Sequence, residues 1–414
     1  MLLEFKCSNH RSIKDEVVFS MLAGSDDSNE ESLKIYGKYR VLRSAVIYGA
    51  NGSGKSNFLD ALLYMSSLVR NSLDRQPGSP VPQAAHKSSA SDKPSSYSIQ
   101  FVKNDLRYAY SFSVRQNMIN EEYLYYFPNG RQTKIFERSD NEVYPGDKYK
   151  KAFNTSMDVF KENRLFLSCA ANYSKVKEVE EAFKFFYNDL VIYDPADNNW
   201  AEYSLKAMQE NDDLKKIFIK IMNALGADIK DVKTRVNKIN LGALAQEADL
   251  PESVIRMLGT GEREIVDAKV VYDNFEIELS QESSGIRHLF EILCPMIDIL
   301  VNGKVLVCDE LDSDLHESVA FQLVELFRDF KNENFAQLIF TTHDTSLLSS
   351  DLFRRDQVWF TEMDSERSTD LYSLVEIKNV RKTENLAKGY VTGKYGAIPI
   401  ISGNIYQILQ SDKS

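Results

Sequence analysis

The sequence predicts an α/β fold that contains a parallel sheet, and three observations carry this prediction. In the C-terminal part, short apolar runs such as "KVLVCDE" and "AQLIFTTHD" alternate with segments of helical spacing, which implies a parallel sheet. A glycine-rich loop, "GANGSGKS", follows the apolar run "RSAVIY" and precedes a segment of helical spacing. Residues 97–127 alternate in polarity and are rich in aromatic side chains, which is typical of antiparallel strands. We therefore expect mixed and parallel sheets flanked by helices.

In chain order, the predicted elements fall into three parts. Short β-prone runs, the glycine-rich loop, a helix after it and the antiparallel strands form an expected N-terminal lobe, residues 1–145. Within it, residues 75–96 are rich in Pro, Ser and Ala, which predicts an exposed loop. Residues 146–264 include "VKEVEEAFKFFYNDL" and "LKKIFIKIMNALG", whose spacing predicts a mainly helical insertion domain. The alternating strands and helices then give a C-terminal lobe, residues 265–414.

Composition limits the class of protein. The chain has 414 residues, 43 % of them apolar, and 50 basic against 61 acidic residues give a formal net charge of −11. The acidic total argues against a sequence-independent coat of nucleic acid, although a local basic groove stays open. The four cysteines are far apart and form no CxxC pair, as expected of buried thiols in a reducing cytoplasm. The sequence shows no signal-peptide pattern and no apolar run of about 18 residues, so we expect a cytoplasmic protein without a membrane span.

The glycine-rich loop has the composition of a phosphate-binding loop (the Walker A pattern). Gly49, Gly52 and Gly54 allow successive backbone N–H groups to point inward as an anion nest, and the following helix adds the positive end of its dipole. Lys55 can reach the β- and γ-phosphates of a nucleotide, and the Ser56 hydroxyl can ligate Mg²⁺. The residues predicted to bind the nucleotide here are Gly49, Asn51, Gly52, Ser53, Gly54, Lys55, Ser56 and Asn57.

Further polar groups follow the buried-strand patterns. Asp309 and Glu310 come directly after Val305–Cys308, and ligands collect at the carboxyl ends of strands in α/β sheets. Asp309 is therefore the predicted metal ligand, and Glu310 is the predicted general base that activates water. His343 ends the run "LIFTTH" and could sense the γ-phosphate or orient the water.

A cluster of small polar residues precedes a strongly amphipathic segment in the C-terminal part. Ser283, Ser284 and Gly285 lie in "LSQESSGIRHLFEIL". They can cap the start of a helix, or they can present hydroxyl and N–H groups to an anion. The chain contains one phosphate loop, so in the second interpretation the cluster would act on the nucleotide of a neighbouring subunit.

These segments, in this order, resemble the ATP-binding cassette class in its SMC and RecF-like branch. The order is "NHRSI", "GANGSGKS", a long insertion, "LSQESSG", "VLVCDELDSDLH" and "TTHD". Within that class the sequence is most similar to prokaryotic AAA-type ATPases of the abortive-infection kind, such as RloA and AbiL-like proteins and, more distantly, the OLD and PARIS ATPases. The likeness covers about residues 1–140 and 265–400. It implies an ABC/SMC-like P-loop NTPase head with a helical insertion domain.

The resemblance assigns the residues to parts of a composite site. It implies that the phosphate loop and Asp309 hold ATP and Mg²⁺, that Glu310 activates water, and that His343 is the switch histidine. Ser283–Gly285 match the signature that completes the site of a partner head, with Ile286 where the family pattern has threonine. Residues 312–315 match the D-loop, which crosses the dimer interface.

Three features of the pattern allow two interpretations each. Arg11 falls where related heads place a basic residue near the nucleotide, and a surface arginine is equally consistent. Gln83 and Gln100 are both candidates for the metal-contacting glutamine. "GYVTGKYGAIP" near the C-terminus fits a tight structural turn or a docking surface for a partner protein.

The resemblance implies a cytoplasmic ATPase that converts ATP and water to ADP and phosphate with Mg²⁺ as cofactor. A γ-phosphate buried between two heads makes their association depend on ATP, which fits a sensor, switch or scaffold better than bulk turnover. The implied partners are further copies of the chain, in at least a head-to-head dimer, and a separate effector, a Toprim-type or other nuclease. Nucleic acid or a phage protein is the implied trigger in a prokaryotic anti-phage system.

Other interpretations remain open. A RecF-type DNA-repair ATPase would clamp duplex DNA directly and needs a basic groove. A transporter's ATPase subunit is disfavoured by the unusual signature and the long insertion. A scaffold that binds ATP only in order to assemble would carry the same motifs. A kinase would need an acceptor site, and the NKxD signature of a GTPase is absent from the sequence.

Overall fold

The computed structural model of the chain describes residues 1–25, 28–30, 33–193, 199–240, 262–329, 334–381 and 384–399. By its internal contacts the chain divides into two compact units. The first unit consists of Met1–Tyr193, Asn302–Leu311 and Phe321–Ser414, and the second of Asp194–Val301 and Asp312–Ala320.

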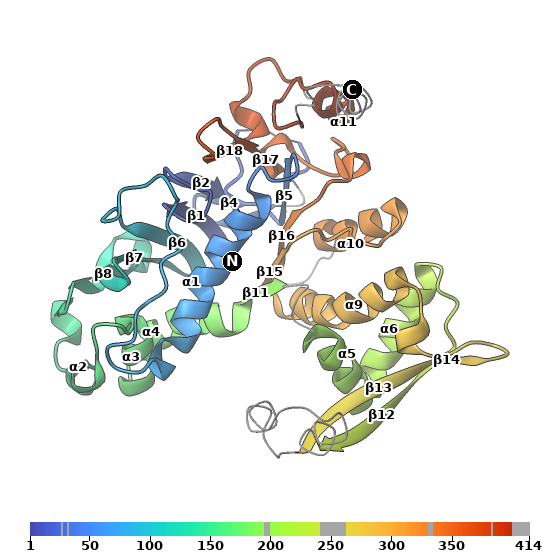
Figure 1. Ribbon diagram of the computed structural model, residues 1–414, viewed down its shortest axis with the longest axis horizontal. Coiled ribbons are helices and arrows are strands. Elements are labelled where there is room, and N and C mark those ends of the chain that lie inside the picture. Colours follow the sequence, from blue (N-terminus) through green and yellow to red (C-terminus); the bar gives the residue numbers. More distant parts are fainter. Residues whose placement is uncertain are drawn as a thin grey trace, which may run out of the picture. The chain divides into compact units, whose positions relative to one another are not determined.

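The first unit contains a six-stranded sheet in the order β11-β15-β16-β5-β17-β18 (Figure 1). All neighbouring strands are parallel except β17 and β18. Strands β5, β15 and β16 are buried along their whole length, which is why each reads as a continuous apolar run. The predicted α/β fold with a parallel sheet is confirmed. The bounds are β5 (Ser44–Gly49), β11 (Leu190–Tyr193), β15 (Val305–Cys308), β16 (Gln337–Thr341), β17 (Val358–Met363) and β18 (Thr369–Ser373).

A second, seven-stranded antiparallel sheet belongs to the same unit, in the order β10-β9-β8-β7-β6-β1-β2. Its strands β6 to β8 are the antiparallel strands that the aromatic-rich segment predicts. Between the two sheets runs helix α1 (Lys55–Asn71), whose Phe58, Leu62 and Met65 share one hydrophobic core with residues of both sheets (Figure 1). The bounds are β1 (Leu2–Ser8), β2 (Val17–Ser20), β6 (Ser95–Lys103), β7 (Leu106–Arg115), β8 (Met118–Tyr126), β9 (Thr133–Ser139) and β10 (Glu142–Pro145).

Smaller elements complete the first unit. A two-stranded hairpin, β3 and β4, precedes the central strand β5, and three short helices, α2 to α4, follow the antiparallel sheet. A short helix, α11, lies near the C-terminal end of the described chain. The bounds are β3 (Lys34–Tyr36), β4 (Tyr39–Val41), α2 (Asn154–Val159), α3 (Phe166–Tyr173), α4 (Lys177–Lys184) and α11 (Leu386–Val391). Helix α10 (Glu317–Asp329) contains the boundary between the two units.

The second unit packs helices against a three-stranded antiparallel sheet, β12-β13-β14 (Figure 1). Helix α5 contacts β13 and helix α6 contacts β12, and the buried side chains of Val232, Val266, Ala268 and Val270 contribute to its core. The bounds are α5 (Asn199–Glu210), α6 (Asp212–Ala224), β12 (Asp231–Asn240), β13 (Glu262–Val271), β14 (Glu276–Glu278) and α9 (Ser284–Asn302).

The region 146–264, expected to be mainly helical, contains strands that the sequence did not predict. Helices α2 to α6 lie there, but β11, β12 and the start of β13 lie there as well. Strand β12 pairs along its full length with β13, and such pairing overrides a weak local preference for helix. Residues 241–261, which include the expected helix "ESVIRMLG", lie outside the described residues. The domain boundaries at 145 and 264 stay predictions, while residues 146–193 belong to the first compact unit.

Two expectations about composition can be compared with the structure. Cys7, Cys169, Cys294 and Cys308 are buried and form no disulfide with one another, and burial raises the pKa of the Cys294 thiol to about 12. Among the helices of the described ranges, none is long and apolar enough to cross a membrane.

A buried carboxylate joins the antiparallel sheet to helix α3. Glu122 on β8 accepts hydrogen bonds from the backbone N–H of Phe166 (2.6 Å), the N–H of Leu167 (2.9 Å) and the Tyr110 hydroxyl (3.0 Å). The buried Arg138 guanidinium lies 3.6 Å from its carboxylate. Burial raises the pKa of Glu122, and Arg138 and the N–H donors act in the opposite direction. Glu122 therefore caps α3 and balances a buried cation.

We expect Glu122→Ala to lower the free energy of unfolding by about 3–5 kcal/mol, because it leaves the buried Arg138 charge without its counter-charge and two backbone N–H groups without their acceptor. The measurement is urea-induced unfolding followed by circular dichroism. Glu121→Ala is the matched control: Glu121 is the exposed neighbour on the same strand, and its loss should change stability by no more than about 0.5 kcal/mol. Equal losses for the two variants would contradict the assignment.

Candidate nucleotide-binding site

The parallel sheet of the first unit brings three of the predicted segments to one edge. Strands β5, β16 and β15 are neighbours and run in the same direction. The phosphate loop follows β5, Asp309 and Glu310 follow β15, and Thr342 and His343 follow β16. Because the carboxyl ends of parallel strands lie at the same edge, these segments converge there, at the position where α/β sheets bind ligands.

The phosphate loop packs closely against β17 and β18. Gly52 and Gly54 have φ values of 76° and 107°, which favour glycine. A Cβ atom on Gly49 would lie 2.7 Å from the carbonyl oxygen of Thr361, and one on Gly54 would collide with Thr369. Asn51, Gly52 and Ser56 are exposed, whereas Ser53 and Lys55 are buried. The loop therefore has one face fixed against the protein and one face open, and its last residues, from Lys55 on, form the start of helix α1.

Lys55 is the buried cation of this loop, with 5 % of its surface exposed. Its Nζ donates hydrogen bonds to the carbonyl oxygens of Gly49 (2.9 Å) and Ala50 (3.4 Å). Burial lowers the pKa of Lys55, and the negative charges of Asp309 and Glu310 oppose this effect. The ammonium group thus lies within electrostatic range of both acids.

Thr341 holds the two acids in place. Its hydroxyl donates to Asp309 Oδ1 (2.5 Å) and accepts from the N–H of Glu310 (2.8 Å). Its carbonyl accepts from the N–H of Leu311 (3.3 Å). Glu310 has a φ of 49°, a strained value for a residue other than glycine, and its side chain is 54 % exposed. Glu310 Oε1 lies 3.7 Å from His343 Nε2, so the structure brings the predicted base and the predicted switch histidine together.

The segment "NHRSI" contacts helix α1 and neighbouring segments. Arg11 Nε lies 2.6 Å from Asp60 Oδ2, and His10 Nε2 lies 2.8 Å from the same oxygen. Asn57 Nδ2 donates to Ser12 Oγ (2.7 Å). Arg11 is therefore held against α1 at Asp60, which lies five residues after Lys55 on this helix. Half of the Arg11 side chain is exposed. Its contact with a nucleotide stays a prediction.

The signature-like residues lie in the second unit, at the start of helix α9. Ser283 Oγ accepts a hydrogen bond from the N–H of Ile286 (3.3 Å), so the capping interpretation describes its position in this chain. Ser283 and Ser284 are exposed. A Cβ atom on Gly285 would lie 2.8 Å from the carbonyl oxygen of Asp314, so the signature-like segment and the segment expected to be the D-loop meet within this unit. Their action on a second subunit stays a prediction.

The two candidate glutamines have partners outside the phosphate loop. Gln83 Nε2 donates to the Lys93 carbonyl (3.1 Å) and its Oε1 accepts from the N–H of Gln116 (3.0 Å). Gln100 Nε2 donates to Glu4 Oε1 (3.0 Å). These bonds give both side chains a structural role, and neither bond favours one glutamine over the other as a metal ligand.

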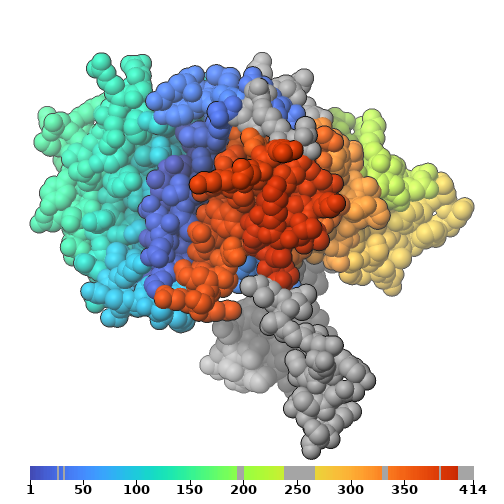
Figure 2. All heavy atoms as spheres, turned by 90° about the horizontal axis from the view of Figure 1, so that it is seen from above, coloured from blue at the N-terminus to red at the C-terminus, as the bar shows by residue number. Residues whose placement is uncertain are grey.

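The segment "GYVTGKYGAIP" packs within the first unit. Tyr390 and Tyr395 are 8 % and 3 % exposed, and both rings pack on Phe360 with centroid distances of 5.6 and 5.8 Å. Residues from the C-terminal part (red) and the N-terminal part (blue) lie side by side on the surface of this unit (Figure 2). The buried rings favour the structural turn over a docking surface.

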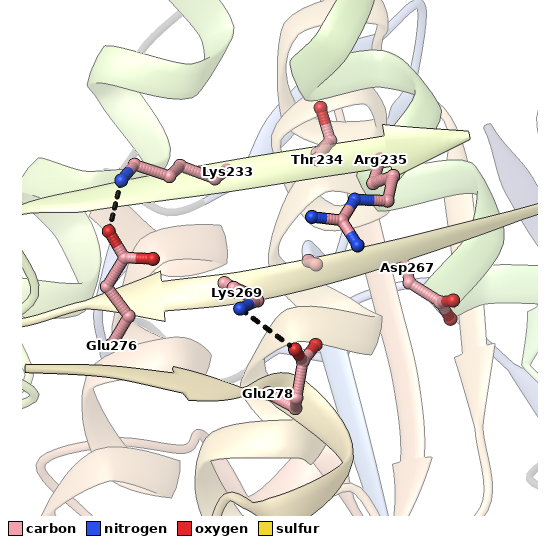
Figure 3. Close-up of a pocket in the computed structure, with 8 residues that line it drawn as sticks. Lys233, Thr234, Arg235, Asp267, Lys269, Glu276 and Glu278 are labelled. Atoms are coloured by element: carbon pink, nitrogen blue, oxygen red, sulfur yellow. Dashed lines mark hydrogen bonds and ion pairs between the residues drawn. The ribbon is translucent and has the colours of Figure 1, made fainter. Parts of the chain in front are cut away.

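A hollow on the sheet of the second unit is a further candidate site. Lys233 pairs with Glu276, and Lys269 Nζ lies 3.2 Å from Glu278 Oε1 (Figure 3). The sequence reasoning did not single out this hollow. Its basic and acidic side chains are equal in number, so it favours neither an anion nor a cation. The lining residues are Lys233, Thr234, Arg235, Asp267, Ala268, Lys269, Glu276 and Glu278.

Several residues of the site in the first unit were missed by sequence reasoning: Ser12, Asp60, Thr341, Thr361 and Thr369. Each acts through a partner distant in sequence, such as Thr361 Oγ1 with Ser53 Oγ (2.6 Å). Thr341 alone had a local signal, because it follows the three apolar residues Leu338–Phe340 of a predicted strand. Among the described residues, no group of three or more His, Cys, Asp or Glu side chains is arranged to hold a metal ion.

Comparison with known proteins gives a family and a set of similar structures. The family model described as "AAA domain, putative AbiEii toxin, Type IV TA system" matches residues 44–349. Curated proteins gave no match. The chain is similar to an SmcHead bound to the C-winged helix domain of ScpA (15 % identity, TM-score 0.44, 90 % of this chain and 97 % of that one). It is also similar to the SMC head domain from Thermotoga maritima (12 %, 0.41, 90 % and 98 %). A third similar structure is the Smc head domain with an extended coiled coil, bound to the C-terminal domain of ScpA derived from Pyrococcus furiosus (13 %, 0.39, 90 % and 96 %).

We expect Thr341→Val to destabilise the Asp309–Glu310 segment, because the Asp309 carboxylate loses a donor and the Glu310 N–H loses an acceptor. The loss in free energy of unfolding should be about 1–3 kcal/mol, measured by urea denaturation, and hydrogen exchange of the Glu310 amide should accelerate. Thr341→Ser keeps the hydroxyl and should lose less. If the Val and Ser variants exchange this amide equally fast, the hydroxyl does not hold the segment.

Proposed function

The chain belongs to the AAA-domain family whose model it matches, and on this premise we propose that it is a Mg²⁺-dependent ATPase. One observation carries the proposal. A glycine loop with a buried lysine lies at the same sheet edge as a strand-end Asp-Glu pair, and Lys55 lies within electrostatic range of both acids. This is the arrangement that phosphoryl transfer needs, since catalysis there rests on positioning and on charge stabilisation.

The residues fit ATP and Mg²⁺ on structural grounds. The open face of the loop and the start of the 17-residue helix α1 offer N–H groups to phosphates. Lys55 can exchange its carbonyl partners for phosphate oxygens. Ser56 and Asp309 would hold Mg²⁺, which neutralises charge on the β- and γ-phosphates when bound. Glu310 would take a proton from water at its carboxylate, and His343 would orient that water.

We further propose that two copies of the chain complete the site. The chain has one phosphate loop and one signature-like segment, and Ser283 and Ser284 are exposed at the start of α9. Exposed hydroxyl and N–H groups at a helix start suit the γ-phosphate of ATP bound to another copy. ATP would then hold the copies together, and its hydrolysis would release them.

The biological role that fits best is a nucleotide-dependent sensor or switch in a prokaryotic anti-phage system, in the cytoplasm. The support is the family description, "AAA domain, putative AbiEii toxin, Type IV TA system", together with the motifs resembling abortive-infection ATPases. The chain would control a separately encoded effector, a Toprim-type or other nuclease, in response to nucleic acid or a phage protein.

Glu310→Gln should lower the rate of ATP hydrolysis by about 10²- to 10⁴-fold, because it removes the proposed general base. ATP affinity should stay within a few-fold of the wild type, and ATP should shift the variant toward a dimer in sedimentation velocity. Lys55→Ala should bind ATP weakly, and Glu317→Gln, an exposed acid outside the site, should match the wild type. Hydrolysis by Glu310→Gln at the wild-type rate would show that another group activates the water.

The defence role predicts that cells carrying this gene and its neighbouring genes resist some phages. When Lys55→Ala replaces the wild type, plaque counts should rise to those of cells without these genes, because the switch can no longer bind ATP. Glu317→Gln again serves as the control and should keep the protection. Equal protection by wild type and Lys55→Ala would exclude an ATP-dependent defence role.

A further inference from the structure

Two threonines of the β17–β18 hairpin contact the closed face of the phosphate loop. Thr369 Oγ1 donates to the carbonyl oxygen of Ser53 (3.0 Å), and Thr361 Oγ1 lies 2.6 Å from Ser53 Oγ. Both threonines are buried, with 4 % and 0 % exposure. Neither was among the residues that the sequence assigned to the nucleotide site, and both are more than 300 residues from the loop in sequence.

Thr369 is itself oriented by the N-terminal turn. Its N–H donates to the carbonyl oxygen of Ser12 (2.8 Å), and its hydroxyl lies 2.7 Å from Ser12 Oγ. Asn57, on the first turn of α1, donates to the same Ser12 Oγ (2.7 Å). A chain of hydrogen bonds therefore runs from α1 through Ser12 to Thr369 and back to the phosphate loop at Ser53.

The bond to Ser53 fixes the direction of a phosphate-binding group. No peptide bond among the described residues is cis, so the peptide between Ser53 and Gly54 is trans. In a trans peptide the C=O and the following N–H point in opposite directions. When Thr369 holds the Ser53 carbonyl on the closed face, the Gly54 N–H must point toward the open face, where a nest of N–H groups binds an anion.

The same contact explains the glycine at position 54. A side chain there would collide with Thr369, and φ is 107°. Gly54 and Thr369 therefore depend on each other. Because Gly54 has no Cβ atom, Thr369 can lie close to the loop, and from there its hydroxyl fixes the direction of the Gly54 N–H.

We propose that Thr369 is a positioning residue for nucleotide binding, and that it acts by directing the Gly54 N–H toward the β- and γ-phosphates of ATP. Ser12 supports Thr369 in this role, so the "NHRSI" turn contributes to the nucleotide site through Ser12 and Thr369. The inference rests on the proposed binding of ATP by this loop, but it does not depend on hydrolysis.

The test compares ATP binding, in the presence of Mg²⁺, by the full-length wild type and by variants in isothermal titration calorimetry. Thr369→Val keeps the shape and removes the hydroxyl, and its Kd for ATP should rise roughly tenfold, the effect expected of one hydrogen bond. Thr369→Ser should restore affinity to within about threefold of the wild type. Ser12→Ala, at a less buried position, should raise Kd in the same direction by a smaller factor.

Ser373→Ala separates positioning from general stability. Ser373 is a buried hydroxyl on the same strand that bonds to the N–H of Val375 and the carbonyl of Val358. Like Thr369→Val, Ser373→Ala should lower the melting temperature of the nucleotide-free protein, but it should leave the Kd for ATP unchanged.

Wild-type affinity in Thr369→Val, or an equal rise in Kd for Ser373→Ala, would overturn the inference while the proposed ATPase function stands. Loss of affinity in Thr369→Val, with rescue by Thr369→Ser, supports it even if the wild type hydrolyses no ATP. A wild type that binds no ATP would contradict both proposals.

Discussion

The parallel pairing of β15, β16 and β5 is the constraint on which the site of the first unit depends. In its register Val307 is opposite Ile339, and Ile339 is opposite Ala45. This alignment brings the ends of the three strands to one edge, so the acids, the histidine and the phosphate loop meet without any loop having to reach across the sheet. A shift of one residue in either pair would turn buried side chains toward the opposite face. The complete burial of these strands therefore protects the geometry of the site.

At this edge of the sheet, two residues adopt states that are unfavourable for folding. Glu310 adopts a positive φ, which ordinarily costs of the order of 1–3 kcal/mol, and the Thr341 hydroxyl offsets part of that cost by holding its N–H and the neighbouring Asp309. Lys55 places a cation in a mostly buried position. Both Glu310 and Lys55 have a proposed role in catalysis or in binding. The surrounding hydrogen bonds hold each side chain or backbone in one conformation.

Much of the fold and the centre of the site could be predicted from the sequence, because their signals are local. The phosphate loop has its glycines and lysine within eight residues, and Asp309 follows an apolar strand directly. The roles of Thr361, Thr369 and Ser12 could not be predicted, because no local pattern marks these polar residues. They contact the phosphate loop or each other only after the N-terminal and C-terminal segments pack together. The pairing of β12 with β13 was missed for a related reason: lysines and asparagines along β12 weaken its alternation, and burial of Val232 and Val270 in the folded unit decides the outcome.

The state of Lys55 suggests how the loop would respond to a nucleotide. Its ammonium is already desolvated and bonded to the neutral carbonyls of Gly49 and Ala50, and burial holds its pKa below the ordinary value. Phosphate oxygens are stronger acceptors than carbonyls, because charge-assisted hydrogen bonds are about twice as strong as neutral ones. Folding has already removed most of the water around the Lys55 ammonium. A phosphate can therefore form the charged contact with a smaller desolvation penalty, which is an example of preorganisation. The Thr369 bond does the same for the backbone: with the Ser53 carbonyl fixed on the closed face, the Gly54 amide need not reorient when a phosphate arrives. The Lys55 side chain and the Gly54 amide are thus both positioned before a nucleotide binds. Burial positions the lysine, and the Thr369 hydroxyl on β18 positions the amide.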